Sequence, residues 1–409
     1  MPDFLNSNKM IIIFAAVGVV LVATAVAMFL THSEFGGDPV AESTFVANEV
    51  LPTPPSVPIE EIVPPGRWDD AFQEENIFVY PSSRLTGMPI REEYLIRRPM
   101  AVVINNIHRA LPQSGIASAD IIYEVLSEGD VTRIVGIFQS YIPEKIGPVR
   151  SARDYFVDFA FNHDALFIHH GASPSGYGRI RGQRINNVDG MTWEGRVFWR
   201  DRTYPYWARN TGTRPLEHSS FTGWYRLEEH IYSQGIRDYF SETPAYGFNF
   251  GEITADYVGT ADRVIVPFSP NYTRTFIFNP ETNLYYVENR DGAHVDALNQ
   301  EQITVTNVLV QFTAQRVVDG EGRRTVQTTG EGLGYLATGG KTFPLRWVKE
   351  DHASPTRWYF SNNTGENNER DEPLTLAPGT TWINVFQSNG TVIFEIDVEE
   401  TDVEETADD

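Results

Sequence analysis

The residues best suited to chemistry are concentrated between positions 147 and 178. Arg150 and Arg153 lie just before a segment with helical apolar spacing, and arginine binds carboxylates and phosphates through paired hydrogen bonds. His169 and His170 follow a short apolar run, and imidazole can take up or release a proton near neutral pH. This stretch is therefore the best candidate for a functional site, and its two arginines indicate an anionic ligand.

A helix must position the two arginines. Apolar side chains at 152, 155, 156, 159 and 160 follow the i, i+3, i+4 spacing of a helix packed on a core. Ser151 is expected to cap the first turn, because a serine hydroxyl accepts a hydrogen bond from a free backbone N–H there. Arginines at a helix N-terminus oppose the helix dipole, so a negative group is expected to compensate them.

The histidines are placed by a predicted buried strand at 165–168. His169, His170 and Ser173 then lie at its C-terminal end, where open α/β sheets usually bind ligands. Adjacent strand residues point to opposite faces, so at most one histidine is expected to face a crevice. The Gly-, Ser- and Arg-rich stretch 171–182 is predicted to be a mobile loop, and it matches no P-loop or dinucleotide fingerprint.

A hairpin is expected to supply further charged residues. Residues 120–141 contain two apolar strands around a Gly-Asp pair, a two-residue loop of the favoured type. If Glu128 pairs with Val131, then Glu124, Glu128 and Arg133 share one face, with Arg133 diagonal to both glutamates. Carboxylates beside an arginine on an apolar face are equally consistent with a structural ion pair and with a site.

These elements together predict one composite site. The expected ligand-binding residues are Arg133, Arg150, Ser151, Arg153 and Ser173. The expected residues of a catalytic version of the site are Asp154, Glu124, His169 and His170, with a carboxylate as base and a histidine as its partner. No nucleophile elbow accompanies them. Neither a cofactor nor a metal is expected, since His163, Asp164 and His169 match no known ligand spacing.

Composition limits the partners. The chain has 409 residues, no cysteine and a formal charge of −23. The stretches 31–66 and 391–409 contain carboxylates but no Lys or Arg, whereas 131–226 carries an excess of arginine. A basic island in an acidic protein indicates a local anion pocket, and the overall balance argues against nucleic acid. The absence of cysteine excludes disulfides, thiolate catalysis and a lipid-modified cysteine anchor.

The N-terminal part is expected to attach the protein to a membrane. After a cytoplasmic stub at 1–9, residues 10–30 carry no charge and are long enough to span a bilayer. The alternative is a cleaved signal peptide with its cleavage site among residues 23–27. Residues 31–66 are rich in Pro, Glu and Thr and are predicted to form a disordered stalk. The bulk of the chain would then be extracytoplasmic, and its oligomeric state is left open.

Two folded regions are predicted after the stalk. Residues 67–250 are expected to form an α/β or α+β domain with a mixed sheet, including a strand at 100–105 and a helix at 219–234. A run of alternating aromatic and arginine residues at 193–209 is typical of packing, and it could also stack on a sugar.

The second region, 251–390, contains short β segments separated by Asn-Pro, Asp-Gly, Gly-Gly and Pro-Gly turns. This pattern predicts an all-β domain of sandwich or barrel type. His294 and Asp296 are expected to lie on its surface. The acidic tail at 391–409 is predicted to be disordered.

Several motifs resemble the YerB-like family of bacterial envelope proteins, a domain of unknown function in two parts. They are ADIIYE at 119–124, Thr132-Arg133, IGPVRSAR at 146–153 followed by Asp154, HHGAS at 169–173, NVLVQF at 307–312 and TWIN at 381–384. The resemblance covers residues 80–390 and implies an α/β domain joined to a β domain outside the membrane. Members are typically lipoproteins; this chain lacks cysteine, so the helix at 10–30 would have to be its anchor.

Two classes of function stay open, because the resemblance implies no reaction. The first is a non-catalytic envelope module that binds an anionic or glycan ligand, or a cell-wall synthesis partner. The second is a transferase or hydrolase acting on a phosphorylated or polyprenyl-linked glycan. The chain is also similar in kind to the LytR-CpsA-Psr proteins, which hold a polyprenyl pyrophosphate with arginines. By this analogy the candidate ligands are a cell-wall polymer and a polyprenyl phosphate.

Overall fold

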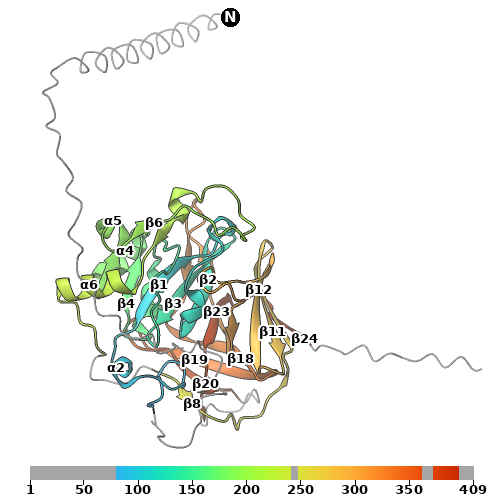
Figure 1. Cartoon of the computed structure of the whole chain (residues 1–409). Coiled ribbons are helices and arrows are strands. Elements are labelled where there is room, and N and C mark those ends of the chain that lie inside the picture. The colour runs from blue at the N-terminus through green and yellow to red at the C-terminus, as the bar shows by residue number, and fades with distance from the viewer. Residues whose placement is uncertain (1–79, 241–246, 362–371, 396–409) are drawn as a thin grey trace, which may run out of the picture. The chain divides into compact units, whose positions relative to one another are not determined.

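The computed structural model describes residues 80–240, 247–361 and 372–395 (Figure 1). The predicted cytoplasmic stub, transmembrane anchor and stalk lie outside these residues, as does the tail from position 396. Among the residues that are described, no helix is long and apolar enough to cross a membrane.

One mixed sheet of 12 strands runs through both predicted regions. In spatial order its strands are β21 (Glu372–Pro373), β20 (Arg357–Phe360), β19 (Lys341–Lys349), β18 (Gly330–Thr338), β15 (Asn307–Thr313), β23 (Thr381–Gln387), β2 (Ile121–Glu128), β3 (Val131–Phe138), β1 (Met100–Asn105), β4 (Leu166–His169) and β5 (Asn187–Asp189), with β9 (Gly259–Thr260) paired to β19. β23 is parallel to β15 on one side and to β2 on the other. Trp382 and Ile383, adjacent residues of β23, are both buried, as a strand covered on both faces requires.

Helices cover both faces of the N-terminal part of this sheet. α3 (Asp154–Phe161) buries Phe156 in the same cluster as Val103 of β1, and α6 (Trp224–Gln234) buries Leu227 in the cluster that contains Val102. Successive residues of a strand face opposite ways, so the two helices lie on opposite faces. The other helical elements are α2 (Glu92–Leu95), α4 (Pro174–Gln183), α5 (Gly190–Trp193) and the 3-10 turns η1 (His108–Ala110), η2 (Ile116–Ser118) and η3 (Leu216–His218).

The C-terminal region is mostly β, as predicted. Its second sheet has the order β13 (Gly292–Ala293), β12 (Leu284–Asn289), β11 (Tyr272–Asn279), β10 (Arg263–Ser269) and β24 (Ile393–Glu395), with β14 (Thr304–Val305) paired to β12. Short pairs are formed by β16 (Gln315–Val317) with β17 (Arg324–Val326), β8 (Asn249–Phe250) with β22 (Thr375–Leu376), and β6 (Trp199–Arg200) with β7 (Ser220–Phe221). β24 lies within the predicted acidic tail, where the partly buried Phe394 packs on the core.

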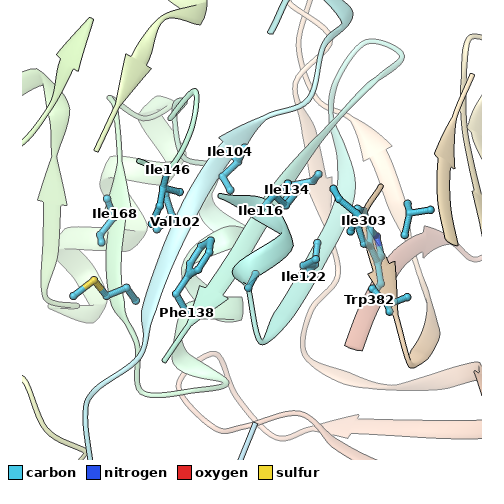
Figure 2. Packing of buried hydrophobic residues seen from close by; sticks show 14 of the residues in the cluster. Val102, Ile104, Ile116, Ile122, Ile134, Phe138, Ile146, Ile168, Ile303 and Trp382 are labelled. Atoms are coloured by element: carbon cyan, nitrogen blue, oxygen red, sulfur yellow. The ribbon is translucent and has the colours of Figure 1, made fainter. Parts of the chain in front are cut away.

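A single apolar cluster links the two regions. Figure 2 shows Val102 and Ile168 of the N-terminal part in the same cluster as Ile122, Ile303 and Trp382. The second sheet packs on this cluster, and the rings of Phe276 and Trp382 meet edge to face with centroids 5.7 Å apart. The N- and C-terminal regions therefore share both a sheet and a core.

The predicted strands at 100–105 and 165–168 correspond to β1 and β4. The predicted helix at 219–234 begins later, at Trp224, because Ser220 and Phe221 pair with β6 instead. The prediction of a mobile loop at 171–182 was wrong. The Ser173 hydroxyl accepts from the Gly176 N–H at 3.1 Å and Pro174 occupies the first turn, so these residues start α4.

The hairpin prediction was right about the turn and wrong about the faces. Glu128 pairs with Val131, but a bulge at Ser127 shifts the register, and Arg133 pairs with Val125. Because a bulge adds one residue to one strand, it reverses which face the following residues occupy. Glu124 therefore points to the face opposite Arg133.

Candidate functional site

A short irregular segment brings Arg150 to the edge of the sheet. Residues 149–152 lie between the ends of β1 and β4: the Arg150 N–H donates to the Val103 carbonyl at 2.9 Å, and the His170 N–H donates to the Arg150 carbonyl at 3.0 Å. β1 and β4 are parallel, so this is their carboxyl end, where α/β folds usually bind ligands. His170 follows directly after β4 at this edge, as the sequence predicted.

A pocket of about 500 Å³ opens at this edge. It is lined by Val149, Arg150, Ser151, His170, Gly171, Ala172, Tyr177, Met191, Arg200, Leu216 and Glu217. Of the predicted site residues, Arg150, Ser151 and His170 are therefore brought together, and the other six do not line the pocket. We call this cavity the Arg150 pocket.

Arg150 is a cation without an acidic partner. Its Nη1 donates to the Glu217 carbonyl oxygen at 2.9 Å, and no carboxylate of the described residues lies within ion-pair distance of it. Burial lowers the pKa of Arg150, while the nearby charges of Glu128 and Glu217 oppose that shift. A partly dehydrated guanidinium that has no carboxylate in ion-pair contact favours the binding of an anion.

Arg200 and His170 form the second polar wall of the pocket. Arg200 is held by Glu194 through two hydrogen bonds of 2.5 and 3.0 Å, and its Nη2 donates to His170 Nε2 at 3.0 Å. A guanidinium can only donate, so the His170 proton lies on Nδ1 and is donated to Ser220 Oγ at 2.8 Å. Burial and the adjacent Arg200 lower the pKa of His170, which favours the neutral ring.

Arg133 and Arg153 form a second cluster behind the pocket, and both are buried. They share one carboxylate, Glu128, and Arg133 also donates to the Ser151 carbonyl. Burial and the charge of Arg153 lower the pKa of Arg133 to about 9. Burial would raise the pKa of Glu128, but the two arginines outweigh it and lower that pKa. Two guanidiniums on one carboxylate leave a surplus of positive charge next to Ser151.

Glu124 lies away from this site. Its carboxylate accepts from Arg274 Nε at 2.8 Å and Nη2 at 3.1 Å, and both side chains are 0% exposed. Asn106 and Thr132 donate to the same carboxylate. The register shift in the hairpin explains this position, and the carboxylate accepts four hydrogen bonds from groups outside the Arg150 pocket.

Three further predicted residues have local partners. His169 is buried; its Nδ1–H donates to the Gly171 carbonyl at 2.9 Å, and its Nε2 lies 3.2 Å from Asn187 Oδ1. Asp154 begins α3 and accepts from Ser175 Oγ at 3.3 Å, while Ser173 caps α4. The predicted cap at Ser151 was wrong, because the residue before α3 is Arg153 and no side chain caps it.

The sequence did not single out Arg200, which lines the pocket, or Asp189, which holds two of the residues that line it. Arg200 lies in the run of alternating aromatic and arginine residues at 193–209. The sequence shows this run, but it does not show that Arg200 contacts His170. The Asp189 carboxylate accepts from the Gly171 N–H and from Tyr177 OH, both at 2.8 Å, and so fixes one wall of the pocket. Nothing local marks Asp189, because its role depends on how β4, α4 and β5 pack.

No metal-ligand cluster is found among the described residues. His163 Nε2 lies 2.8 Å from Tyr123 OH, and Asp164 accepts two hydrogen bonds from Arg237. His163 and Asp164 therefore each have a partner within the protein.

The fold and the motifs define a member of a two-part family of unknown function. Residues 85–237 match the family described as "Protein of unknown function (DUF3048) N-terminal domain", and residues 264–383 match "Protein of unknown function (DUF3048) C-terminal domain". The chain belongs to this family, and the resemblance predicted from its motifs is confirmed.

A relative and a solved structure agree with this assignment. The chain is 29% identical over 309 residues to "Putative lipoprotein YerB" of Bacillus subtilis (strain 168), which covers 74% of this chain and 85% of the relative. The crystal structure of the YerB protein from Bacillus subtilis matches with a TM-score of 0.65 and 26% identity, over 77% of this chain and 100% of that one.

Proposed function

We propose that the protein is a membrane-anchored, extracytoplasmic envelope protein that binds an anionic ligand in the Arg150 pocket. Residues 10–30 would provide the anchor in place of a lipid, since the chain lacks cysteine. The description of the Bacillus subtilis relative as a lipoprotein supports an envelope location. The anion could belong to a cell-wall polymer or to a polyprenyl phosphate.

The observation that carries the proposal is the unpaired charge of Arg150. It lines a pocket at the carboxyl end of parallel strands, and no described carboxylate pairs with it. Behind it, Arg133 and Arg153 share a single glutamate, which leaves one positive charge in excess in that cluster. Arg150 gives a phosphate or carboxylate a charged hydrogen-bond donor within this cavity.

A transferase or hydrolase has less support. Two of the residues assigned to catalysis, Glu124 and His169, are buried and bonded to other parts of the protein. His170 does line the pocket, but its Nε2 is occupied by Arg200. A binding role needs neither a free base nor a nucleophile, and it therefore fits these contacts better.

The proposal can be tested by titrating the full-length chain with inorganic phosphate in a calorimeter. Arg150→Ala is expected to weaken binding about 10- to 100-fold, because a hydrogen bond to a charged group contributes about 1.5–3 kcal/mol. Arg316→Ala is the matched control: this exposed arginine lies on β16, outside the pocket lining. Near-UV circular dichroism verifies that both variants are folded. Equal affinity in wild type and Arg150→Ala, or no binding by wild type, would contradict the proposal.

A further inference from the structure

Two exposed apolar side chains stand at the mouth of the Arg150 pocket. Met191 is 67% exposed and Leu216 is 55% exposed, and both line the cavity. Met191 lies beside Gly171, where an added Cβ would meet the Met191 Cγ at 3.4 Å and the Ser151 Oγ at 3.6 Å. Its thioether chain therefore lies next to a polar wall of the pocket. Covering these two side chains with an apolar group of a ligand would be favourable, because it removes their apolar surface from water.

The backbone that carries Leu216 is held by the two arginines of the pocket. Arg200 Nη1 donates to the Leu216 carbonyl at 2.8 Å, and Arg150 Nη1 donates to the Glu217 carbonyl at 2.9 Å. These bonds fix the position of Leu216 relative to the guanidinium groups. If Arg150 binds the phosphate of a larger ligand, the Leu216 side chain would therefore lie close to the group that the phosphate carries.

A guanidinium group beside two apolar side chains favours one of the two candidate ligands, the cell-wall polymer and the polyprenyl phosphate, over the other. A wall polymer would place hydroxyl groups against Met191 and Leu216, which offer no hydrogen bonds in return. A hydrocarbon chain would instead remove their surface from water while its phosphate binds Arg150. We infer that the pocket takes a phosphate that carries an apolar chain, as the phosphate of a lipid carrier does. This inference rests on the proposed anion site and names its ligand class.

The test compares three probes that share a phosphate: inorganic phosphate, ethyl phosphate and hexyl phosphate. Each is titrated into the full-length chain in lipid nanodiscs, and a titration into empty nanodiscs corrects for partitioning. Each methylene that becomes fully buried strengthens binding about four-fold. Hexyl phosphate is expected to bind at least about ten-fold more tightly than ethyl phosphate, allowing for partial burial of its four additional methylenes.

Variants locate the contact. The double variant Met191→Ser/Leu216→Ser is expected to remove most of the preference for hexyl phosphate over ethyl phosphate. Leu333→Ser is the matched control, since Leu333 is 61% exposed and lies outside this pocket. Arg150→Ala should weaken all three probes.

The outcomes separate the two proposals. If the three probes bind equally to the wild type, or if the double variant keeps the full preference for hexyl phosphate, the chain-binding inference is overturned and the anion site stands. If none of the probes binds to the wild type, the anion site fails and the inference fails with it.

Discussion

The pair formed by Glu124 and Arg274 provides the sharpest test of whether the predicted base is structural. Both side chains are 0% exposed and share two hydrogen bonds. Arg274 Nη1 also donates to His294 Nδ1 at 2.8 Å, so the His294 proton lies on Nε2 and is donated to Gln113 Oε1 at 2.7 Å. Arg274→Met would leave a buried carboxylate without its counter-charge. Breaking a buried pair in this way typically costs about 3–5 kcal/mol.

The measurement is urea unfolding followed by tryptophan fluorescence and far-UV circular dichroism. Arg274→Met should lower the free energy of unfolding by about 3–5 kcal/mol. Glu331→Gln is the control, because its pair with Arg346 lies at the surface, with Glu331 67% exposed, and should contribute no more than about 1 kcal/mol. Adding Glu124→Gln to Arg274→Met should recover part of the loss, since no uncompensated charge would then stay buried.

The opposite result would remove the argument that Glu124 has a structural role. If Arg274→Met unfolds within about 1 kcal/mol of the wild type, the buried pair is not needed for stability and the reasoning from burial fails. If Glu124→Gln keeps wild-type stability but loses phosphate binding, Glu124 belongs to the functional site after all.

Three other predictions concern single side chains. Gly190→Ala places a methyl group against the His170 ring and should cost about 1–3 kcal/mol and weaken phosphate binding, whereas Gly178→Ala, with open space around it, should be neutral or stabilising; equal unfolding curves for both would contradict this. Ser173→Ala should lower stability by about 1 kcal/mol through loss of the α4 cap, and an unchanged urea midpoint would show that the cap contributes nothing. Burial and the charge of Lys349 lower the pKa of His163 to about 3, so the unfolded chain binds the extra proton first as pH falls below 6.5. As the pH falls from 6.5 to 4.5, His163 alone should therefore lower the free energy of unfolding by about 1.4 kcal/mol per pH unit. The His163→Gln variant should lose less stability than the wild type over the same range.

Turn residues and apolar spacing over a few positions predicted many of the strands and turns. The predicted Asn-Pro turn at 279–280 does separate β11 from β12, and the predicted Asp-Gly turn at 291–292 lies between β12 and β13. The errors also have local causes. Ser-Pro at 173–174 is a helix-start signal, and it outweighs the Gly and Ser content that predicts a loop. The bulge at Ser127 cannot be seen in an alternating pattern because both registers bury apolar residues.

The candidate site was predicted only in part. Arg150, Ser151 and His170 meet in one pocket, and all three lie in the stretch that the sequence singled out. Arg133 and Arg153 lie behind it on Glu128, and their positions follow from the bulge and from the start of α3. His294 and Asp296, expected at the surface, are instead buried. The Asp296 carboxylate accepts from the N–H groups of Gly115 and Ala117 at 2.9 and 2.8 Å.

The sequence by itself determined the family, several of the elements, such as β1 and β4, and the basic character of the stretch around Arg150. These properties depend on residue types and on spacings of a few positions, which apolar periodicity and turn residues report directly. The tertiary structure alone decided that β23 is inserted between β15 and β2, that Glu124 pairs with Arg274, and that Leu216 and Arg200 face Arg150 across one pocket. Such contacts join segments far apart in the chain. They are selected by the burial of the whole core, which no local pattern encodes.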